Sequence, residues 1–177
     1  MTSLETERLI LRMWEPEDFE PYAAICADPA VMRFLATDGK PLSRFDAWRS
    51  VAAHVGHWHL KGFGMFAVVE RASGELIGRI GPWQPEGWPD FEIGWTLGSP
   101  HWGHGYATEA VRACIRHSFT TLGRTHLISI IDPDNTRSIK VAERVGERLE
   151  GTTTLPHVPH KALLQYGLYR ADWENQT

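Results

Sequence analysis

Two glycines near the middle of the chain stand where the backbone could bind a phosphate. The stretch HWGHGYATEA, residues 101–110, places Gly103 and Gly105 directly before a run of small and apolar residues with helical spacing. The preceding stretch EIGWTL, residues 92–97, has the composition of a strand. A strand-to-helix turn leaves N–H groups free at the positive end of the helix dipole, and glycine lets a ligand approach the backbone closely. These residues therefore predict an anion site.

The two common nucleotide-binding motifs do not fit this stretch. A P-loop requires Lys and then Ser or Thr after its last glycine, whereas Tyr106 and Ala107 follow here. A dinucleotide fingerprint requires Gly or Ala three places after the second glycine, where Thr108 stands, and it belongs to a parallel βαβ unit. A glycine turn that only caps the helix is the simpler alternative.

The elements that must position this turn alternate between helical and strand-like periodicity. Helices are predicted over residues 15–27, 31–35, 43–62, 105–122 and 135–145, and strands over residues 8–13, 63–70, 76–80, 91–97, 126–131, 149–154 and 163–169. A loop rich in Gly, Pro and Trp is predicted over residues 81–89. This order predicts an α+β fold with a mixed, mostly antiparallel sheet flanked by helices. Since no repeat or linker divides the chain, we expect a single domain over residues 1–177.

The composition excludes several classes of protein. A chain of 177 residues with 42% hydrophobic and 23% charged residues can bury a proper core. Its net charge of −4 argues against a nucleic-acid partner, and it contains no apolar run long enough to span a membrane. Cys26 and Cys114 lie among apolar residues, and no signal peptide precedes them, so we expect a cytoplasmic protein with reduced cysteines. Exposed tryptophans on a sheet with open edges also allow a homodimer.

The glycine stretch resembles the acetyl-CoA pyrophosphate loop of the GNAT N-acetyltransferase superfamily, Gln/Arg-x-x-Gly-x-Gly/Ala, with Trp102 in place of Gln or Arg. A second stretch, DPDNTRSIKVAERVG at residues 132–146, resembles that superfamily's Asn-x-x-Ser-x-x-x-x-Glu-x-x-Gly segment. Three shorter stretches, residues 5–12, 28–32 and 91–95, resemble the branch that includes the ribosomal-protein N-terminal alanine acetyltransferases. The resemblance covers roughly residues 5 to 170 in the right order.

The resemblance implies an enzyme that moves an acetyl group from acetyl-CoA directly to a primary amine, such as a protein N-terminus or a small amine. It places the cofactor's pyrophosphate on the loop formed by Trp102, Gly103, His104, Gly105, Tyr106, Ala107 and Thr108. It also places Asn135 on the pantetheine arm, although an Asn here would equally cap the following helix. Acetyl-CoA is the only cofactor expected, and it acts as a co-substrate.

The reaction requires a base for the amine and an acid for the departing thiolate. The resemblance implies that Glu92, on the strand before the loop, is the base, with Asp90 as a weaker rival and an ordinary solvated carboxylate as the alternative. It implies that Ser138 is the acid, although a serine in a first helical turn also commonly makes a local hydrogen bond. The chain departs from the family at Glu147, which stands where the family usually has Phe.

The resemblance implies an acceptor groove built from residues 32–41, 83–88 and 154–161, which offer many aromatic side chains. His54, His57 and His59 lie on one predicted helix, but no metal is expected, because His54 and His57 lack a third ligand of suitable spacing and a solvated helix face is favoured. Two other functions stay open: a non-catalytic acyl-CoA-binding sensor or interaction domain that keeps the loop, and a nucleotide-binding domain unrelated to CoA.

Overall fold

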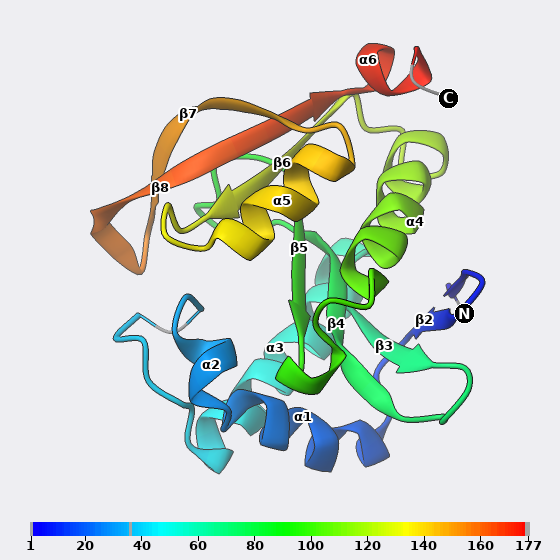
Figure 1. The fold of residues 1–177 in the computed structure, drawn as a ribbon, viewed down its shortest axis with the longest axis vertical. Helices are drawn as coiled ribbons and strands as arrows, with labels where there is room; N and C mark the ends of the chain where they lie inside the picture. Colours follow the sequence, from blue (N-terminus) through cyan, green and yellow to red (C-terminus); the bar gives the residue numbers. More distant parts are fainter. Residues whose placement is uncertain (1, 36, 176–177) are drawn as a thin grey trace.

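An open sheet of eight strands forms the centre of the computed structural model, which describes residues 2–35 and 37–175 (Figure 1). The strands are β1 (Leu4–Glu5), β2 (Leu9–Arg12), β3 (Phe66–Glu70), β4 (Leu76–Trp83), β5 (Glu92–Leu97), β6 (His126–Ile131), β7 (Arg148–Leu155) and β8 (Val158–Tyr169). They lie in the order β1-β2-β3-β4-β5-β6-β8-β7, and only β5 and β6 pair in parallel. This confirms the predicted α+β fold with a mixed, mostly antiparallel sheet.

Helices cover both faces of the sheet. The α-helices are α1 (Phe19–Cys26), α2 (Pro29–Met32), α3 (Arg44–Lys61), α4 (Tyr106–Thr120), α5 (Thr136–Arg144) and α6 (Arg170–Glu174), and two 3-10 turns span η1 (Pro16–Asp18) and η2 (Ser99–His101). Local signals set several ends: the Ser43 side chain caps α3, and Gly62, with φ of 75°, ends it. None of the described helices is both long enough and apolar enough to cross a membrane.

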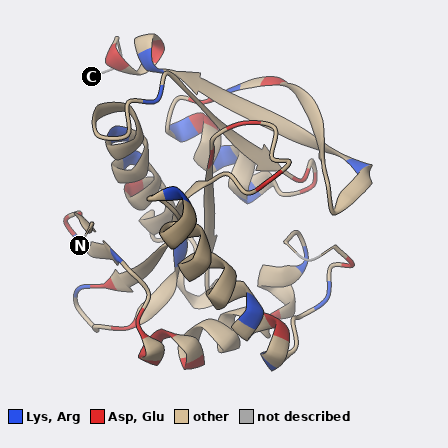
Figure 2. Ribbon diagram, turned by 180° about the vertical axis from the view of Figure 1, so that it is seen from behind, with Lys and Arg blue, Asp and Glu red and all other residues tan. Residues whose placement is uncertain are grey.

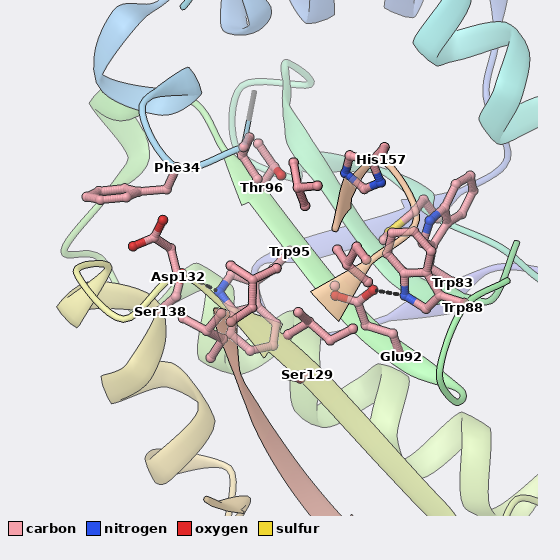
Figure 3. A pocket seen from close by; sticks show the side chains of 18 of the residues that line it. Phe34, Trp83, Trp88, Glu92, Trp95, Thr96, Ser129, Asp132, Ser138 and His157 are labelled. Atoms are coloured by element: carbon pink, nitrogen blue, oxygen red, sulfur yellow. Dashed lines mark hydrogen bonds between the residues drawn. The ribbon is translucent and has the colours of Figure 1, made fainter. Parts of the chain in front are cut away.

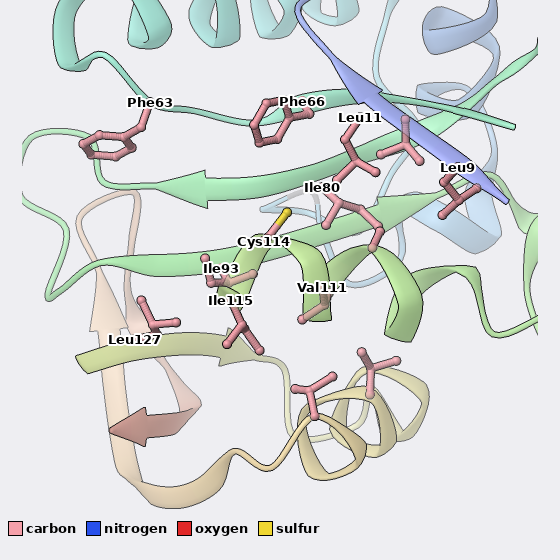
Figure 4. Close-up of a cluster of buried hydrophobic side chains, with 14 of the residues drawn as sticks. Leu9, Leu11, Phe63, Phe66, Ile80, Ile93, Val111, Cys114, Ile115 and Leu127 are labelled. Atoms are coloured by element: carbon pink, nitrogen blue, oxygen red, sulfur yellow. The ribbon is translucent and has the colours of Figure 1, made fainter. Parts of the chain in front are cut away.

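The larger core lies between the sheet and α4. The buried side of α4, from Ala110 to Phe119, packs on alternate residues of the central strands, including Phe66, Ile80 and Ile93 (Figure 4). A second, smaller cluster on the other face joins α1 and α3 to the sheet through Tyr22. Cys26 and Cys114 are both buried and unpaired, as predicted.

Several predicted boundaries differ from the structure, and two of these differences affect the surroundings of β5. The loop expected over residues 81–89 is shorter, because β4 continues to Trp83 through a full set of antiparallel pairs with β5. The last hairpin is longer than expected, because β8 begins at Val158 and leaves only Pro156 and His157 between it and β7. Both extensions bring aromatic or histidine side chains next to β5.

His54 and His57 correct the expectation of a solvated helix face. Both side chains are buried, and both rings contact Trp83, at centroid distances of 5.1 and 4.4 Å. The charged residues of α3 instead gather at its two ends, and its middle carries none (Figure 2).

The parallel pair β5–β6 is joined only where Glu92 lies opposite Ile128. There, the Ile128 N–H donates to Phe91 O at 2.9 Å. The next rung of a parallel ladder would join the Ile130 N–H to Ile93 O. Instead, the Ser129 hydroxyl reaches Ile93 O at 2.9 Å, and the strands separate beyond this point (Figure 1). The separation opens the sheet beside the start of α4.

Close approach of β4 and β5 requires glycine at position 78. A methyl group added there would lie 2.1 Å from Thr96 O and 2.8 Å from Leu97 Cα, both backbone atoms. We expect Gly78→Ala to lower the free energy of unfolding by about 1–3 kcal/mol, because the strands must move apart. Gly56→Ala, in the open middle of α3, is the matched control and should raise it by about 1 kcal/mol. Urea unfolding of both variants checks this; equal effects at the two positions would contradict it.

Candidate active site

The glycine turn has the conformation that its sequence predicted. Gly103 and Gly105 both have φ of 83°, the left-handed region that glycine adopts without strain, and Gly105 is the N-cap of the 15-residue helix α4. Within the described residues, no acceptor bonds the backbone N–H groups from Gly103 to Thr108. These N–H groups and the helix dipole together favour an anion at this point.

The N-terminal strand region holds the turn in place. Arg8 donates to the carbonyl of His104 at 2.9 Å and pairs with Glu109 of α4 at 2.6 Å. Glu109 also accepts from the Thr6 hydroxyl and from the Arg8 backbone N–H. Tyr106 lies under the Arg8 guanidinium and donates its hydroxyl to Glu70. The side chains of Tyr106 and Glu109 therefore fix the loop to the sheet, and they leave its backbone N–H groups free.

Trp102 orients a cation from another helix. Its indole N–H donates to Leu97 O at 2.9 Å, and the guanidinium of Arg137, in the first turn of α5, lies 4.5 Å from its ring centroid. A cation held on an indole face is attracted by the ring quadrupole. The sequence analysis did not predict Arg137 as a site residue. One signal was available: Trp102 stands where the family's loop has Gln or Arg, so a cation at this loop had to come from another element.

A cavity of about 810 Å³ runs from the glycine turn along α5. Four basic side chains line it, against one acidic side chain, Asp134; the basic residues are Arg33, Arg137, Lys140 and Arg144. Free amides, a helix N-terminus and clustered cations match a ligand with several phosphates. The cavity therefore suits the phosphate-rich half of CoA, and its length suits an extended arm.

A second cavity, of about 430 Å³, adjoins the first one. Both are lined by Phe34, Leu35, Trp95, Thr96, Asn135 and Ser138, which mark where they meet. All three segments expected to form the acceptor groove contribute to the second cavity, through residues such as Phe34, Trp88 and His157 (Figure 3). The stacked rings of Trp88 and His157, 5.8 Å apart and tilted by 10°, join the loop before β5 to the tip of the β7–β8 hairpin.

Glu92 lies inside this second cavity with its carboxyl buried. The Trp88 indole N–H donates to its Oε2 at 2.6 Å (Figure 3), and the Ile130 N–H, freed from the sheet ladder, also faces the carboxylate. Burial raises the pKa of Glu92 to about 7, against the smaller lowering effects of Trp88, Ile130 and Arg79. A carboxyl with this pKa changes protonation state near neutral pH, as a general base must.

Glu147, the departure from the family, is a second buried carboxyl close to the first. Its Oε1 lies 2.9 Å from Ser129 Oγ, which in turn lies 2.9 Å from Ile93 O. A serine hydroxyl has one proton and cannot donate to both oxygens, so both contacts are favourable only when Glu147 is protonated and donates to Ser129. Burial, with Glu92 nearby, raises the pKa of Glu147 to about 8, in agreement with this geometry.

Ser138 and Asn135 lie where the cavities join. The Trp95 indole N–H donates to Ser138 Oγ at 3.2 Å, which leaves the serine proton free to donate (Figure 3). The Asn135 side-chain oxygen accepts from the Ser138 N–H at 3.2 Å and caps α5, so its side-chain NH₂ group stays available to a ligand. The rival base, Asp90, instead bonds His126 at 2.9 Å and does not line the second cavity.

An open mixed sheet with a glycine turn at the start of α4 is the architecture of an acetyltransferase domain. A family model for the acetyltransferase (GNAT) domain matches residues 8–148, so the chain belongs to the GNAT acetyltransferase family. The chain is 32% identical to p20 of Bacillus licheniformis, described as an uncharacterized N-acetyltransferase, over 85% of each sequence. It is thus an acetyl-CoA-dependent acyltransferase.

Solved structures agree with this assignment. An acetyltransferase from Agrobacterium tumefaciens superposes with a TM-score of 0.84 at 32% identity, covering 96% of this chain and 95% of that one. The ribosomal-protein-S5-alanine acetyltransferase of Vibrio fischeri superposes with a TM-score of 0.73 at 18% identity, over 98% and 99% of the two chains. At that identity, the second likeness shows the shared fold.

The buried carboxyl of Glu147 makes stability depend on pH. Its pKa of about 8 in the folded protein exceeds the ordinary value of 4.5, so its contribution is full below pH 4.5 and is lost as the pH rises through 8. Glu147→Gln mimics the protonated acid, because its NH₂ group can donate to Ser129. We expect this variant to gain unfolding free energy over the wild type between pH 5 and 8, by on the order of a few kcal/mol. Denaturant unfolding at several pH values measures it, with exposed Glu143→Gln as the control; a gain independent of pH would contradict it.

Proposed function

We propose that this protein transfers an acetyl group from acetyl-CoA to a primary amine, with Glu92 as general base and Ser138 as general acid. One observation carries the proposal: a basic cavity that begins at a glycine turn opens, at Ser138, into a second cavity that contains a buried carboxyl with a pKa near 7. The two cavities give donor and acceptor separate spaces that meet at one place. The acceptor is a small amine or a protein N-terminus, and the chain works in the cytoplasm.

The chain's own groups would hold the cofactor. The free N–H groups from Gly103 to Thr108 would bind the pyrophosphate, with the Arg137 guanidinium beside them and the Thr108 hydroxyl at the first turn of α4. The Asn135 side-chain NH₂ group would bind the pantetheine arm, since its oxygen already caps α5. Bound acetyl-CoA supplies the thioester that the amine attacks.

The proton transfers follow from the positions of two side chains. Glu92, ionised, removes a proton from the acceptor ammonium or amine, directly or through water. The amine nitrogen attacks the thioester carbonyl carbon, so that a C–N bond forms and the C–S bond breaks. Ser138 gives its proton to the departing sulfur and takes up the second proton that the acetylated nitrogen loses, while Trp95 keeps the serine oxygen in place. The products are the acetylated amine and CoA, and the proton held on Glu92 returns to solvent.

Removing the base tests this assignment. We expect Glu92→Gln to lower kcat by about 10²-fold or more at pH 7, because an amide keeps the contact with Trp88 and cannot take a proton. The dissociation constant for acetyl-CoA should stay within about twofold of that of the wild type, since the cofactor's phosphates bind far from Glu92. Wild-type kcat/KM should rise with pH through about 7, where Glu92 ionises, and this limb should vanish in the variant.

Thiol release from acetyl-CoA measures this rate over a panel of amines, and exposed Glu86→Gln is the matched control in the same loop. Unchanged turnover in Glu92→Gln across the pH range would remove Glu92 from the reaction. Tight CoA binding with no thiol release for any amine would instead favour a sensor domain.

The cation on Trp102 gives a separate test of the cofactor site. We expect Arg137→Gln to weaken acetyl-CoA binding by about 10-fold, because a charge-assisted bond to phosphate is lost. The salt dependence of binding should also become shallower. Calorimetric titration with CoA at two salt concentrations measures both effects, and Arg116→Gln, on the exposed side of α4, serves as control. Equal affinity in Arg137→Gln and the control would exclude Arg137 from the site.

A further inference from the structure

The floor of the acceptor cavity contains a guanidinium without an acidic partner. Arg79 of β4 lies directly opposite Thr96 of β5, and both line the cavity. The Arg79 Nε–H donates to the Tyr22 hydroxyl at 3.1 Å. Of the carboxylates in the described residues, none lies within ion-pair distance of Arg79. A guanidinium fork in a cavity whose unpaired acid, Glu92, lies beyond ion-pair distance is well suited to bind a carboxylate from a ligand.

Thr96 adds an unused hydroxyl at the same place. Its side chain is 7% exposed, and its Oγ1 has no hydrogen-bond partner, although it lines the cavity. A buried polar group without a partner costs free energy that a suitable ligand atom restores. Arg79 and Thr96 therefore present adjacent donors to the same ligand group.

The spacing from these donors to Glu92 fits a small molecule. Glu92, Gly94 and Thr96 share one face of β5, and Glu92 Oε1 lies 3.6 Å from the position of a β-carbon added at Gly94. The Glu92 carboxyl thus reaches along the strand toward Thr96 over Gly94, and the flexible Met65 side chain packs at the same position, with its Cε 2.6 Å from the added β-carbon. Arg79 is also close enough to Glu92 to lower the pKa of its carboxyl, so one small molecule can carry an amine to Glu92 and a carboxylate to Arg79.

The other charges of the cavity also disfavour a polycation. Asp132 is already paired with Lys161, and burial lowers the pKa of His54 well below its ordinary value, so that this side chain stays neutral. Glu92 is the only acid left unpaired in the described lining, and it must face the reacting amine. A polyamine or aminoglycoside would bring further positive charges toward Arg79 without an acid to receive them.

We propose that the acceptor is an amine that itself carries a carboxylate, namely a free amino acid with an apolar side chain. Its carboxylate binds the Arg79 guanidinium and the Thr96 hydroxyl while its amine faces Glu92. Trp83, Trp88 and Phe34 provide the apolar walls for its side chain (Figure 3). This inference rests on the proposed function, because it names the acceptor class of the same site.

The experiment compares three amines that differ in one group. L-phenylalanine carries the carboxylate, L-phenylalaninamide replaces it with a neutral amide, and phenethylamine replaces it with hydrogen; spermidine is added as a polycation. We expect kcat/KM for phenylalanine to exceed that of each of the others by at least about 10-fold, because a charged group that lacks its partner is strongly disfavoured in such a site.

Variants then assign the preference to residues. Arg79→Met should lower the ratio of kcat/KM for phenylalanine over phenethylamine by at least about 10-fold, and Thr96→Val by about threefold or more. The ratio cancels any change that Arg79 imposes on the pKa of Glu92, since both amines use the same base. Arg116→Met is the matched control and should leave the ratio unchanged. If Arg79→Met does not fold because its bond to Tyr22 is lost, the same kcat/KM ratio is measured for Arg79→Lys and Thr96→Val instead.

A binding measurement separates this inference from the proposed function. Tryptophan fluorescence follows N-acetyl-L-phenylalanine and N-acetylphenethylamine binding to the protein saturated with CoA. Tighter binding of N-acetyl-L-phenylalanine than of N-acetylphenethylamine, with the difference lost in Arg79→Met, supports the carboxylate site. This holds even if no thiol is released from acetyl-CoA, because the absence of thiol release overturns only the transfer reaction. Two results would overturn the carboxylate site and leave acetyl transfer standing. One is equal kcat/KM for phenylalanine and phenethylamine, and the other is a preference for phenylalanine that Arg79→Met leaves unchanged.

Discussion

The separation of β5 from β6 is the constraint on which the rest of the site depends. A parallel pair that continued past Glu92 and Ile128 would close the sheet and leave no space at its centre. Side chains replace the missing rung, since the Ser129 hydroxyl reaches Ile93 O and the Ile130 N–H faces the Glu92 carboxyl. Ile93 O and the Ile130 N–H, which lose their partners in the sheet, therefore both stay satisfied. The same opening buries Glu92 and lets two cavities meet beside it.

This arrangement places two carboxyl groups in a region with little water. Burial raises the pKa of both carboxyl groups, and the nearby Glu92 raises that of Glu147 further. The two residues have different surroundings, however. Glu92 receives the Trp88 N–H and lines the acceptor cavity, whereas Glu147 Oε2 is buried without a partner. As the pH rises, Glu92 is therefore the first of the two to ionise, and Glu147 keeps its proton and helps to hold Ser129 in place.

Much of the fold and of the candidate site could be predicted from short-range sequence signals. The glycine turn, the caps of α3 and α5 and the face that Glu92 shares with Thr96 all follow from residue type and local periodicity. The burial of His54 and Glu147 could not be predicted from the sequence, because polar residues are usually exposed. Only the folded structure shows that His54 packs against Trp83 and that Glu147 bonds Ser129. Arg137 was missed for a similar reason: its place over Trp102 depends on how α5 packs against the loop, and sequence spacing does not encode that contact.

The charges of the two cavities match the ligands that the proposed function assigns to them. The cavity at the glycine turn has several cations, which suit a ligand with several phosphates, whereas the cavity that contains Glu92 has one cation, Arg79, without an ion-pair partner. That cation lowers the pKa of Glu92 and so weakens it as a base. In the proposed complex, the carboxylate of an amino acid neutralises Arg79 and removes part of this effect. The acceptor that fits the cavity would therefore also strengthen the base that activates it, and an amine without a carboxylate would leave that base weaker.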